Sequence, residues 1–380
     1  MSVDPRQARR ILKFLACYTR IMEFSKRLRS LRVATDQHHL DAFLISHLPN
    51  VRYLCGFTGS AGVLLVTSHD QVLFSDGRYT QQAKEQVQGA RIKIGKKSAL
   101  VSAGEWLGKR HSIRRIGIEA AHLTVADRAA LAKSLCRKAL FVAAAPIVEQ
   151  LRMIKDAAEI AGIRAACHLG AALFTRLTAA LRPGVSESEA AGQLEFEARK
   201  SGAEQMAFPT IIAAGARSAL PHGRASNAAL PASGFVVCDF GVILAGYCSD
   251  MTRTVHLGPA GSEARSNYNA VLEAQLAAIN AVRPGNTAGE VDHAARKLLY
   301  NRKLGRFFTH STGHGVGLEI HEAPRLAAGQ KEVLRPGMVV TIEPGIYMAG
   351  KWGVRIEDTV VVTETGCEIL TPCPKDLLTL

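Results

Sequence analysis

The chain has 380 residues, of which 47% are hydrophobic and 21% are charged, the composition of a folded globular protein rather than a disordered one. This length exceeds the usual size of a single hydrophobic core, so we expect two domains. No run of eighteen apolar residues occurs, and we therefore predict no transmembrane helix and no membrane partner.

The charge balance is basic, with 47 Lys and Arg residues against 33 Asp and Glu residues, a net charge of +14. Such a charge raises the question of nucleic-acid binding. The basic residues are scattered, however, only 6% of residues are aromatic, and no zinc-finger or RNA-binding signature occurs. We expect a solvated basic surface and no nucleic-acid partner.

The cysteines and the first residues bear on localisation. Eight cysteines are dispersed without a C-x-x-C pair, which favours a reducing compartment over a disulfide framework. In residues 1–22, Lys13 and Arg20 interrupt the apolar stretch that a signal peptide would need. We expect a cytoplasmic protein in which residues 1–22 are a helical extension or precede a true start at Met22.

Residues 23–150 alternate between helical and strand patterns, which predicts an α/β domain. Thr124 is a plausible N-cap for one of these helices. The predicted helices are Phe24–Ala34, Thr80–Val87, Ala99–Lys109 and Val125–Cys136, and the predicted strands are Asp41–Ser46, Gly62–Ser68, Gln71–Ser75, Arg91–Gly95, Arg115–Glu119 and Ala139–Ala145.

The pattern changes around residues 146–156, and we place a domain boundary near residue 150. A long helix, Ala157–Leu181, is followed by Pro183–Gly184. Ser-x-x-Glu and Thr-x-x-Glu capping boxes then open two further helices. They are formed by Ser186 with Glu189, for a helix to about Gly202, and by Thr287 with Glu290, for the helix Val291–Asn301.

The order helix, helix, β-hairpin occurs twice in residues 151–380, which predicts two related halves. The first copy ends in a hairpin that contains Cys238–Asp250. The second ends in two β-rich runs, Met338–Glu343 and Val354–Thr363. Each copy therefore places two acidic residues on a hairpin.

The segment C-D-F-G-V-I-L-A-G-Y-C-S-D carries Asp239 and Asp250 at the ends of the first hairpin. If the turn centres on Leu244–Ala245, the two residues lie opposite each other, with Cβ atoms about 5 Å apart. Carboxylates this close repel unless a proton or a cation lies between them. Cys238 and Cys248 are alternative ligands, but strand neighbours point to opposite faces, so we expect them to be small buried residues.

Further donors follow toward the C-terminus. Oxygen-rich ligation with one imidazole suits Mn²⁺, Fe²⁺ or Co²⁺, and Zn²⁺ is an alternative. Two divalent cations would neutralise four carboxylates, so the pattern favours a two-metal site. The donors are His222 in L-P-H-G, His310, His314 and His321 in T-H-S-T-G-H-G-V-G-L-E-I-H-E-A-P, Glu343 in T-I-E-P-G-I-Y, and Glu357 with Asp358 in G-V-R-I-E-D.

These motifs resemble those of the pita-bread metallopeptidases of the aminopeptidase P and prolidase (Xaa-Pro peptidase) family, over about Phe24–Leu370. L-P-N-V-R-Y-L-C-G-F-T-G-S-A-G and D-G-R-Y in the first domain belong to the same resemblance. It implies an α/β N-terminal creatinase-like domain over residues 23–150. It also implies an α+β pita-bread catalytic domain over residues 151–380, built from two pseudo-symmetric helix–hairpin halves.

The resemblance carries roles onto particular residues. It implies that Asp250 and Glu357 bridge two metals, that Asp239 holds one of them, and that His314 and Glu343 hold the other. Mn²⁺ is the first choice of metal, with Co²⁺, Zn²⁺ or Fe²⁺ as alternatives. Glu343, His222 and His321 fall on catalytic positions, and substrate-binding positions are His222, His310, His321, Tyr347 and Arg355.

Two supporting residues follow from strand periodicity. Arg355 lies two residues before Glu357, on the same strand face, so it can steady a ligand carboxylate by a charge-assisted hydrogen bond. Thr252 stands in the same relation to Asp250.

The implied activity is metal-dependent hydrolysis of the Xaa-Pro bond at a peptide N-terminus, by a homodimer that acts on proline-containing peptides. F-T-G-S-A-G and D-G-R-Y favour an Xaa-Pro aminopeptidase. The alternative is an Xaa-Pro dipeptidase (prolidase), which shares the site. A third reading is an inactive scaffold of the same fold, which the complete ligand set makes less favourable.

Overall fold

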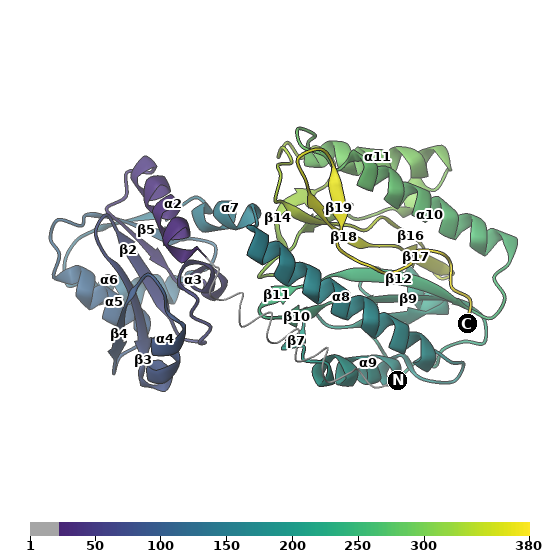
Figure 1. The fold of residues 1–380 in the computed structure, drawn as a ribbon, viewed down its shortest axis with the longest axis horizontal. Helices are drawn as coiled ribbons and strands as arrows, with labels where there is room; N and C mark the ends of the chain where they lie inside the picture. Colours follow the sequence, from purple (N-terminus) through teal and green to yellow (C-terminus); the bar gives the residue numbers. More distant parts are fainter. Residues whose placement is uncertain (1–22) are drawn as a thin grey trace. The chain divides into compact units, whose positions relative to one another are not determined.

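The computed structural model describes residues 23–380, which divide into a unit of residues 23–152 and a unit of residues 153–380 (Figure 1). The division falls within helix α7 (Ile147–Met153). The extension predicted for residues 1–22 lies outside the described residues.

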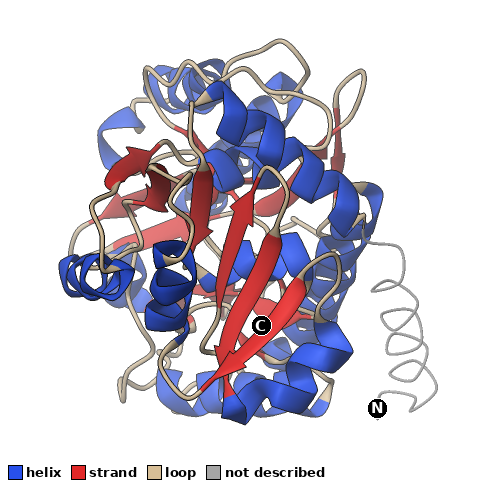
Figure 2. Ribbon diagram, turned by 90° about the vertical axis from the view of Figure 1, so that its left-hand side faces the viewer, coloured by secondary structure: helices blue, strands red, loops and turns tan. Residues whose placement is uncertain are grey.

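The first unit is built on a six-stranded mixed sheet in the order β4-β3-β2-β1-β5-β6. Ala42 and Leu44 of β1 pack in a cluster with residues of α5 and α6, while α3 contacts the same strand as well. Figures 1 and 2 show the strands with helices packed along them. The elements are α2 (Phe24–Gln37), β1 (Ala42–Ile45), α3 (Leu48–Cys55), β2 (Val63–Thr67), β3 (Gln71–Asp76), α4 (Thr80–Gln86), β4 (Arg91–Gly95), α5 (Ala99–Gly108), β5 (Arg115–Glu119), α6 (Val125–Leu135) and β6 (Leu140–Ala144).

The helices of this unit show how local chemistry sets their ends. Thr124 caps α6 as predicted, because its side chain accepts a hydrogen bond from the Asp127 amide. Helix α3 was not predicted, although it carries both end signals. Pro49 lies in its first turn, and Gly56 ends it with a positive φ of 81°.

The second unit consists of two halves with the same order of elements, each with its own hydrophobic core. The first core joins α8 and α9 to β8, β9, β10 and β12, and the second joins α10 and α11 to β15–β18. In Figure 1, α10 and α11 lie above the strands of this unit, and α9 lies below them. The helices are α8 (Ala157–Ala180), α9 (Glu187–Lys200), α10 (Ser262–Ala281) and α11 (Ala288–Asn301), and the strands are β7 (Gln205–Met206), β8 (Ile211–Ala214), β9 (Gly234–Phe240), β10 (Val242–Leu244), β11 (Tyr247–Cys248), β12 (Met251–Leu257), β13 (Gly313–Gly315), β14 (Glu322–Leu326), β15 (Val339–Ile342), β16 (Gly345–Met348), β17 (Trp352–Arg355), β18 (Asp358–Val362) and β19 (Cys367–Ile369).

Both predicted capping boxes are present, at Ser186 with Glu189 and at Thr287 with Glu290. Helix α8 is long and apolar enough, by length and composition, to cross a membrane, although the sequence contains no unbroken run of eighteen apolar residues. Half of its apolar window is buried within the unit, where it packs against α9, β10 and β11. We interpret α8 as a core helix.

The first hairpin has a different register from the one predicted. Ala245 and Gly246 form its turn, with φ values of 49° and 82°. Positive φ at both positions is what a two-residue hairpin turn of type I′ requires. The turn centre therefore lies one residue later than expected. Asp239 of β9 pairs with Thr252 of β12, and Asp250 is diagonal to it rather than opposite.

The second predicted hairpin divides into two sheets. β15 pairs with β18, whereas β16 pairs with β17 in a separate two-stranded sheet. The run Val354–Thr363 is therefore broken at Ile356 and Glu357, which belong to neither strand. This break lets Glu357 leave the strand at the boundary between the sheets.

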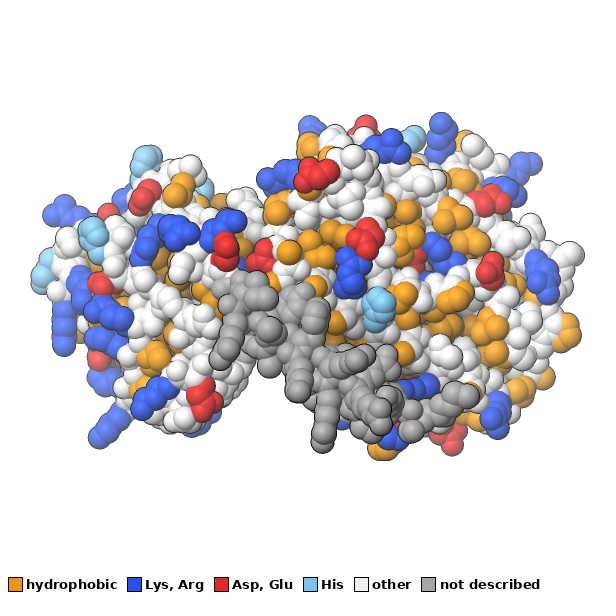
Figure 3. All heavy atoms as spheres, in the orientation of Figure 1, with side chains coloured by type: hydrophobic (Ala, Val, Ile, Leu, Met, Phe, Trp, Pro, Cys, Tyr) orange, Lys and Arg blue, Asp and Glu red, His pale blue; other side chains and the backbone are white. Residues whose placement is uncertain are grey.

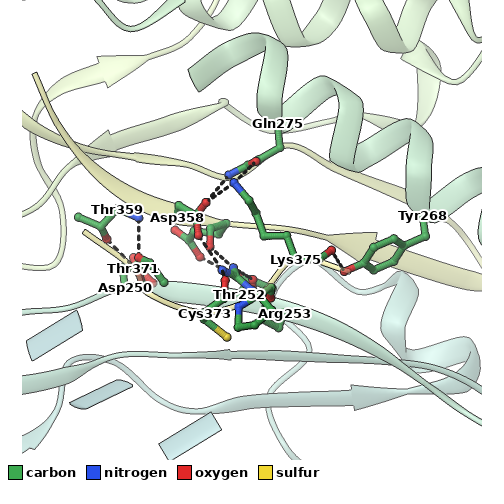
Figure 4. A network of polar contacts seen from close by, with 12 residues as sticks. Asp250, Thr252, Arg253, Tyr268, Gln275, Asp358, Thr359, Thr371, Cys373 and Lys375 are labelled. Atoms are coloured by element: carbon green, nitrogen blue, oxygen red, sulfur yellow. Dashed lines mark hydrogen bonds and ion pairs between the residues drawn. The ribbon is translucent and has the colours of Figure 1, made fainter. Parts of the chain in front are cut away.

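A buried ionic network joins the two halves. Arg253 of β12 donates to Asp358 of β18 at 2.7 Å and to the Glu357 carbonyl at 2.5 Å. Gln275 and Lys375 donate to the other oxygen of Asp358 at 2.9 and 2.7 Å (Figure 4). Glu357 is a predicted metal ligand through its side chain, and Arg253 of the opposite half thus holds its backbone carbonyl.

Charged side chains of both signs are visible on one face of the molecule (Figure 3). On the face shown in Figure 3, Lys and Arg side chains lie among neutral, acidic and hydrophobic side chains and form no single continuous patch among the described residues. Mixed charge of this kind is typical of a solvated protein surface.

We predict that Asp358→Ala lowers the free energy of unfolding of the second unit by about 3–5 kcal/mol, because it leaves the buried Arg253 and the partly buried Lys375 without their carboxylate. Urea unfolding followed by Trp352 fluorescence measures this in a Trp106→Phe background, which removes the other tryptophan. The matched control is Glu368→Ala, which breaks an exposed pair with Arg164 and should cost under about 1 kcal/mol. Equal costs for the two variants would contradict the prediction.

Candidate metal centre

The five predicted ligands come from both halves of the second unit and meet where the hairpins face each other. In each half one acidic residue immediately precedes a strand: Asp250 precedes β12, and Glu357 precedes β18. The other three are Asp239 within β9, His314 within β13 and Glu343 directly after β15.

A cavity of about 630 Å³ brings the predicted site together. Nine of the ten predicted site residues line it, and Tyr347 is the exception. Asp250, His314 and Glu357 offer ligand atoms that all lie within 4.8 Å of one another. The lining residues from the prediction are His222, Asp239, Asp250, His310, His314, His321, Glu343, Arg355 and Glu357.

His314 is oriented as a cation ligand. Its Nδ1 lies 2.9 Å from the Gly315 carbonyl and donates to it, which leaves the lone pair of Nε2 free. That Nε2 faces Glu343 Oε1 at 3.4 Å and Asp250 Oδ2 at 3.5 Å. Burial lowers the pKa of His314 to about 4, so the ring is neutral at pH 7. A lone pair that faces two carboxylates is stable only with a cation or a proton between them.

The carboxylates around His314 also need a cation or a proton beside them. Asp239 Oδ1, Asp250 Oδ1 and Glu357 Oε1 are buried and have no hydrogen-bond partner among the described residues. Burial, and then the charge of Glu357, raises the pKa of Asp250 well above its ordinary value. Buried oxygens without partners are costly, and bound cations would satisfy them. The donor set therefore fits divalent cations.

The supporting hydrogen bonds cross between the halves. Arg355 donates to a predicted ligand carboxylate, as expected, and that carboxylate is Asp239, at 2.5 Å. Thr252, which was expected to support Asp250, donates to Glu357 at 2.7 Å. Arg355 also donates to Thr252 Oγ1 at 3.1 Å. Each half thus orients a carboxylate of the other.

Tyr347 lies behind the cavity and links two predicted substrate residues. Arg355 donates to the Tyr347 hydroxyl at 2.6 Å, and this hydroxyl donates to His310 Nε2 at 2.9 Å. Burial, and then the charge of Arg355, lowers the pKa of His310 to about 4, which keeps its ring neutral. Nδ1 of His310 donates to the Ser311 carbonyl at 2.8 Å, so the tautomer follows from both contacts.

The two cysteines beside the aspartates face away from the cavity lining. Cys238 and Cys248 are buried, and the Cys248 thiol is directed at the Leu318 carbonyl. Burial raises the pKa of the Cys238 thiol, which disfavours the thiolate that a metal would need.

Sequence patterns gave no role to several residues of this site. Arg224 and Arg325 line the cavity, and Arg325 is the cross-strand partner of His314. The only sequence signal for Arg325 is its position directly after H-E-A-P, and the β13–β14 register is needed to place it beside His314. Asp358 was noted next to Glu357, yet its bond to Arg253 depends on a contact 105 residues apart.

Both domains of the chain are similar to known protein families. Residues 161–364 match the model of metallopeptidase family M24, and residues 27–154 match the creatinase/prolidase N-terminal domain. The chain belongs to metallopeptidase family M24. The predicted fold class is confirmed, namely a creatinase-like N-terminal domain and a pita-bread catalytic domain, and the protein is a metallopeptidase.

Three relatives illustrate the similarity. The Xaa-Pro dipeptidase of Pyrococcus horikoshii is 38% identical, over 90% of this chain and 96% of its own. The structure of the Xaa-Pro dipeptidase from Bacillus anthracis has a TM-score of 0.91 and 40% identity, over 94% of this chain and 100% of its own. The X-Pro aminopeptidase from Thermotoga maritima has a TM-score of 0.85 and 35% identity, over 91% and 100%.

Crowded carboxylates make the metal-free protein pH-sensitive. Burial raises the pKa of Glu343 from 4.5 to about 8. The folded state therefore binds the proton more tightly than the unfolded chain, so this stabilisation is complete below pH 4.5 and is lost as the pH rises through 8. We predict that the urea midpoint of metal-free protein, followed by Trp352 fluorescence in the Trp106→Phe background, falls between about pH 5 and about pH 8.

Glu343→Gln is the matched variant for this prediction, because it removes the charge at nearly constant shape. It should flatten the decline in the metal-free protein. An unchanged slope in Glu343→Gln would contradict the assignment of the decline to this carboxylate.

Proposed function

We propose that the protein hydrolyses Xaa-Pro dipeptides with a pair of divalent cations, of which Mn²⁺ is the first candidate. The observation that carries the proposal is the neutral His314, whose lone pair faces Asp250 and Glu343 in the lining of a cavity that His222, His310 and His321 also line. The Xaa-Pro dipeptidases among the relatives support the choice of substrate.

In this proposal Asp239, Asp250, His314, Glu343 and Glu357 hold the cations. Such cations supply activation of a water molecule and polarisation of the peptide carbonyl. Mn²⁺ is preferred over softer ions because four of the five donors are carboxylates, and Co²⁺, Zn²⁺ and Fe²⁺ are the alternatives.

The chain's own residues would manage protons and position the substrate. Glu343 would accept a proton from the attacking water, and the position of its carboxylate in the cavity lining beside His314 supports this role. His222 and His321 line the same cavity, and we assign them hydrogen bonding to the carbonyl oxygen and protonation of the leaving proline nitrogen. That nitrogen needs an external proton because a tertiary amide carries none.

Arg325 offers a specific reason to favour dipeptides. Its Cα pairs with that of His314, so both side chains extend from the same face of the β13–β14 pair, and both line the cavity. The proline of an Xaa-Pro dipeptide ends in a free carboxylate, which a guanidinium binds well by paired hydrogen bonds. Arg224, from the segment that carries His222, is a second cation in the lining.

An Xaa-Pro aminopeptidase is the second candidate. The X-Pro aminopeptidase from Thermotoga maritima has nearly the same fold and comparable identity, which favours it. The two activities differ in the substrate that follows proline, not in the proposed metal site.

Two further expectations belong to this proposal. Cys55, Cys136, Cys167, Cys238, Cys367 and Cys373 form no disulfide among the described residues, which supports a reducing compartment and hence the cytoplasm. A homodimer is proposed on the resemblance to the family alone.

We predict that Mn²⁺-loaded protein cleaves Xaa-Pro dipeptides faster than Xaa-Pro-Yaa tripeptides, as measured by release of the first amino acid. Asp250→Ala and Glu343→Ala should bind less metal by elemental analysis and lose at least about 100-fold in kcat, while the urea midpoint shows that they remain folded. Faster cleavage of the tripeptides would favour the aminopeptidase, and activity retained in either variant would contradict the metal assignment.

We predict that Arg325→Met raises KM for an Xaa-Pro dipeptide by about 10-fold or more, because it removes a charge-assisted contact to the carboxylate. The same dipeptide with an amidated C-terminus lacks that charge, so its KM should change little. Arg224→Met is the matched variant for the neighbouring guanidinium. A similar loss on both substrates would show that Arg325 does not recognise the carboxylate.

A further inference from the structure

Two buried carboxylates outside the proposed metal centre have a common arrangement. Glu187 lies at the start of α9 and Asp292 in the second turn of α11, and both have no exposed surface. Each forms an ion pair with one arginine, and each pair contacts a loop that carries a histidine of the cavity. Neither carboxylate lines the cavity.

In the first half, Glu187 and Arg217 fasten the segment that carries His222. Glu187 accepts hydrogen bonds from the Ala214 amide at 2.9 Å and from the Ser226 amide and hydroxyl at 3.0 and 2.7 Å. Arg217 donates to Glu187 at 2.9 Å and to the Arg224 carbonyl at 2.8 Å. His222 therefore lies in a segment that is held on both sides.

In the second half, Asp292 and Arg296 fasten the segment that carries His310. Asp292 accepts hydrogen bonds from the Thr312 amide at 3.2 Å and its hydroxyl at 2.8 Å. Arg296 donates to Asp292 at 2.7 Å, to the Phe308 carbonyl at 3.1 Å and to the His310 carbonyl at 2.5 Å. The guanidinium also lies 4.3 Å from the Phe308 ring centroid.

The two carboxylates lie on the same helix face in the two halves, although the arginines come from different elements: Arg217 from the turn Gly215–Ala219 after β8 and Arg296 from α11 itself. Glu187 is one residue after the N-cap Ser186, and Asp292 is five residues after the N-cap Thr287. A difference of four residues is about one helical turn, so both carboxylates lie on the same face relative to their caps. In each pair the carboxylate is buried and the arginine is about one-third exposed. Such a pair adds little to stability compared with apolar packing, so its presence in both halves points to a role in loop geometry.

We propose that Glu187–Arg217 and Asp292–Arg296 are two independent pairs of positioning residues, which hold His222 and His310 respectively for the substrate. Neither pair touches the reacting atoms. The role in catalysis rests on the proposed function, but the fastening of each loop does not. Each pair acts on its own histidine and leaves the histidine of the other half unaffected.

Amide hydrogen exchange tests the fastening without any assay of activity. Arg296→Met should raise exchange in residues 308–312 and leave residues 214–226 unchanged, whereas Arg217→Met should do the reverse. These arginines are about one-third exposed, so their replacement is milder than replacement of the buried carboxylates. Arg302→Met, which breaks an exposed pair with Glu273, is the control and should change neither segment. No local increase in either variant would overturn the proposal.

Double-mutant cycles in kcat/KM for an Xaa-Pro dipeptide test the catalytic consequence. Arg296→Met should cost about 10-fold in a chain with His310, because small displacements of a positioned group are costly, and almost nothing in a His310→Ala background. In the crossed pair, Arg296→Met with His222→Ala, the losses in kcat/KM of the two single variants should instead multiply. Arg296→Lys should recover only part of the loss, since an ammonium does not reproduce the paired contacts of the guanidinium.

The outcomes separate the two proposals. Multiplicative effects for Arg296 with His310, like those of a merely structural residue, would overturn the positioning role. If the wild-type protein cleaves no Xaa-Pro dipeptide, the proposed function fails, and hydrogen exchange still decides whether the two pairs fasten their loops.

Discussion

Four carboxylates around one cavity, three of them buried and Glu343 partly buried, are the constraint on which the second unit depends. Asp239 pairs with Arg355 through one oxygen only, and its other oxygen, like one oxygen each of Asp250 and Glu357, is buried without a partner among the described residues. Without cations this arrangement is held against mutual repulsion and loss of hydration. The surrounding fold must therefore keep these groups together, and bound cations would recover the cost.

The fold meets this constraint with two apolar cores that stabilise the halves and with polar contacts that join the halves at the site. Each half carries its own apolar core, away from the acidic side chains. Polar contacts then connect the halves at the site itself, where Thr252 and Arg355 each serve a carboxylate of the opposite half. Arg253 and Asp358 form a further layer of contacts behind them. Displacement of one half would therefore disturb ligands from both, which makes the proposed centre dependent on the correct docking of two cores.

The sequence allowed much of this to be predicted, because local signals carry it. The capping boxes at Ser186 and Thr287 and the strand–helix alternation in the first domain depend on neighbouring residues, and they are present in the structure. The family was evident from motifs that lie far apart, and matches over both domains confirm it. The roles of individual site residues remain proposals that their shared cavity supports.

Register and long-range contacts could not be predicted. The first hairpin was placed one residue out because Ala245, which is unusual at positive φ, shares its turn with Gly246. The crossed supports depend on pairs more than 100 residues apart, such as Thr252 with Glu357. Strand periodicity assigns a face but not a partner in another sheet. The preference for an aminopeptidase was drawn from motifs in the first domain, and the relatives favour a dipeptidase instead.

The most direct test of the proposed two-metal centre is a crystal structure of the Mn²⁺-loaded protein with anomalous scattering data collected at the manganese edge. The account predicts two anomalous peaks in the cavity, both in contact with Asp250 and Glu357, with His314 Nε2 bound to one of them. A single peak, or peaks that avoid these carboxylates, would contradict it.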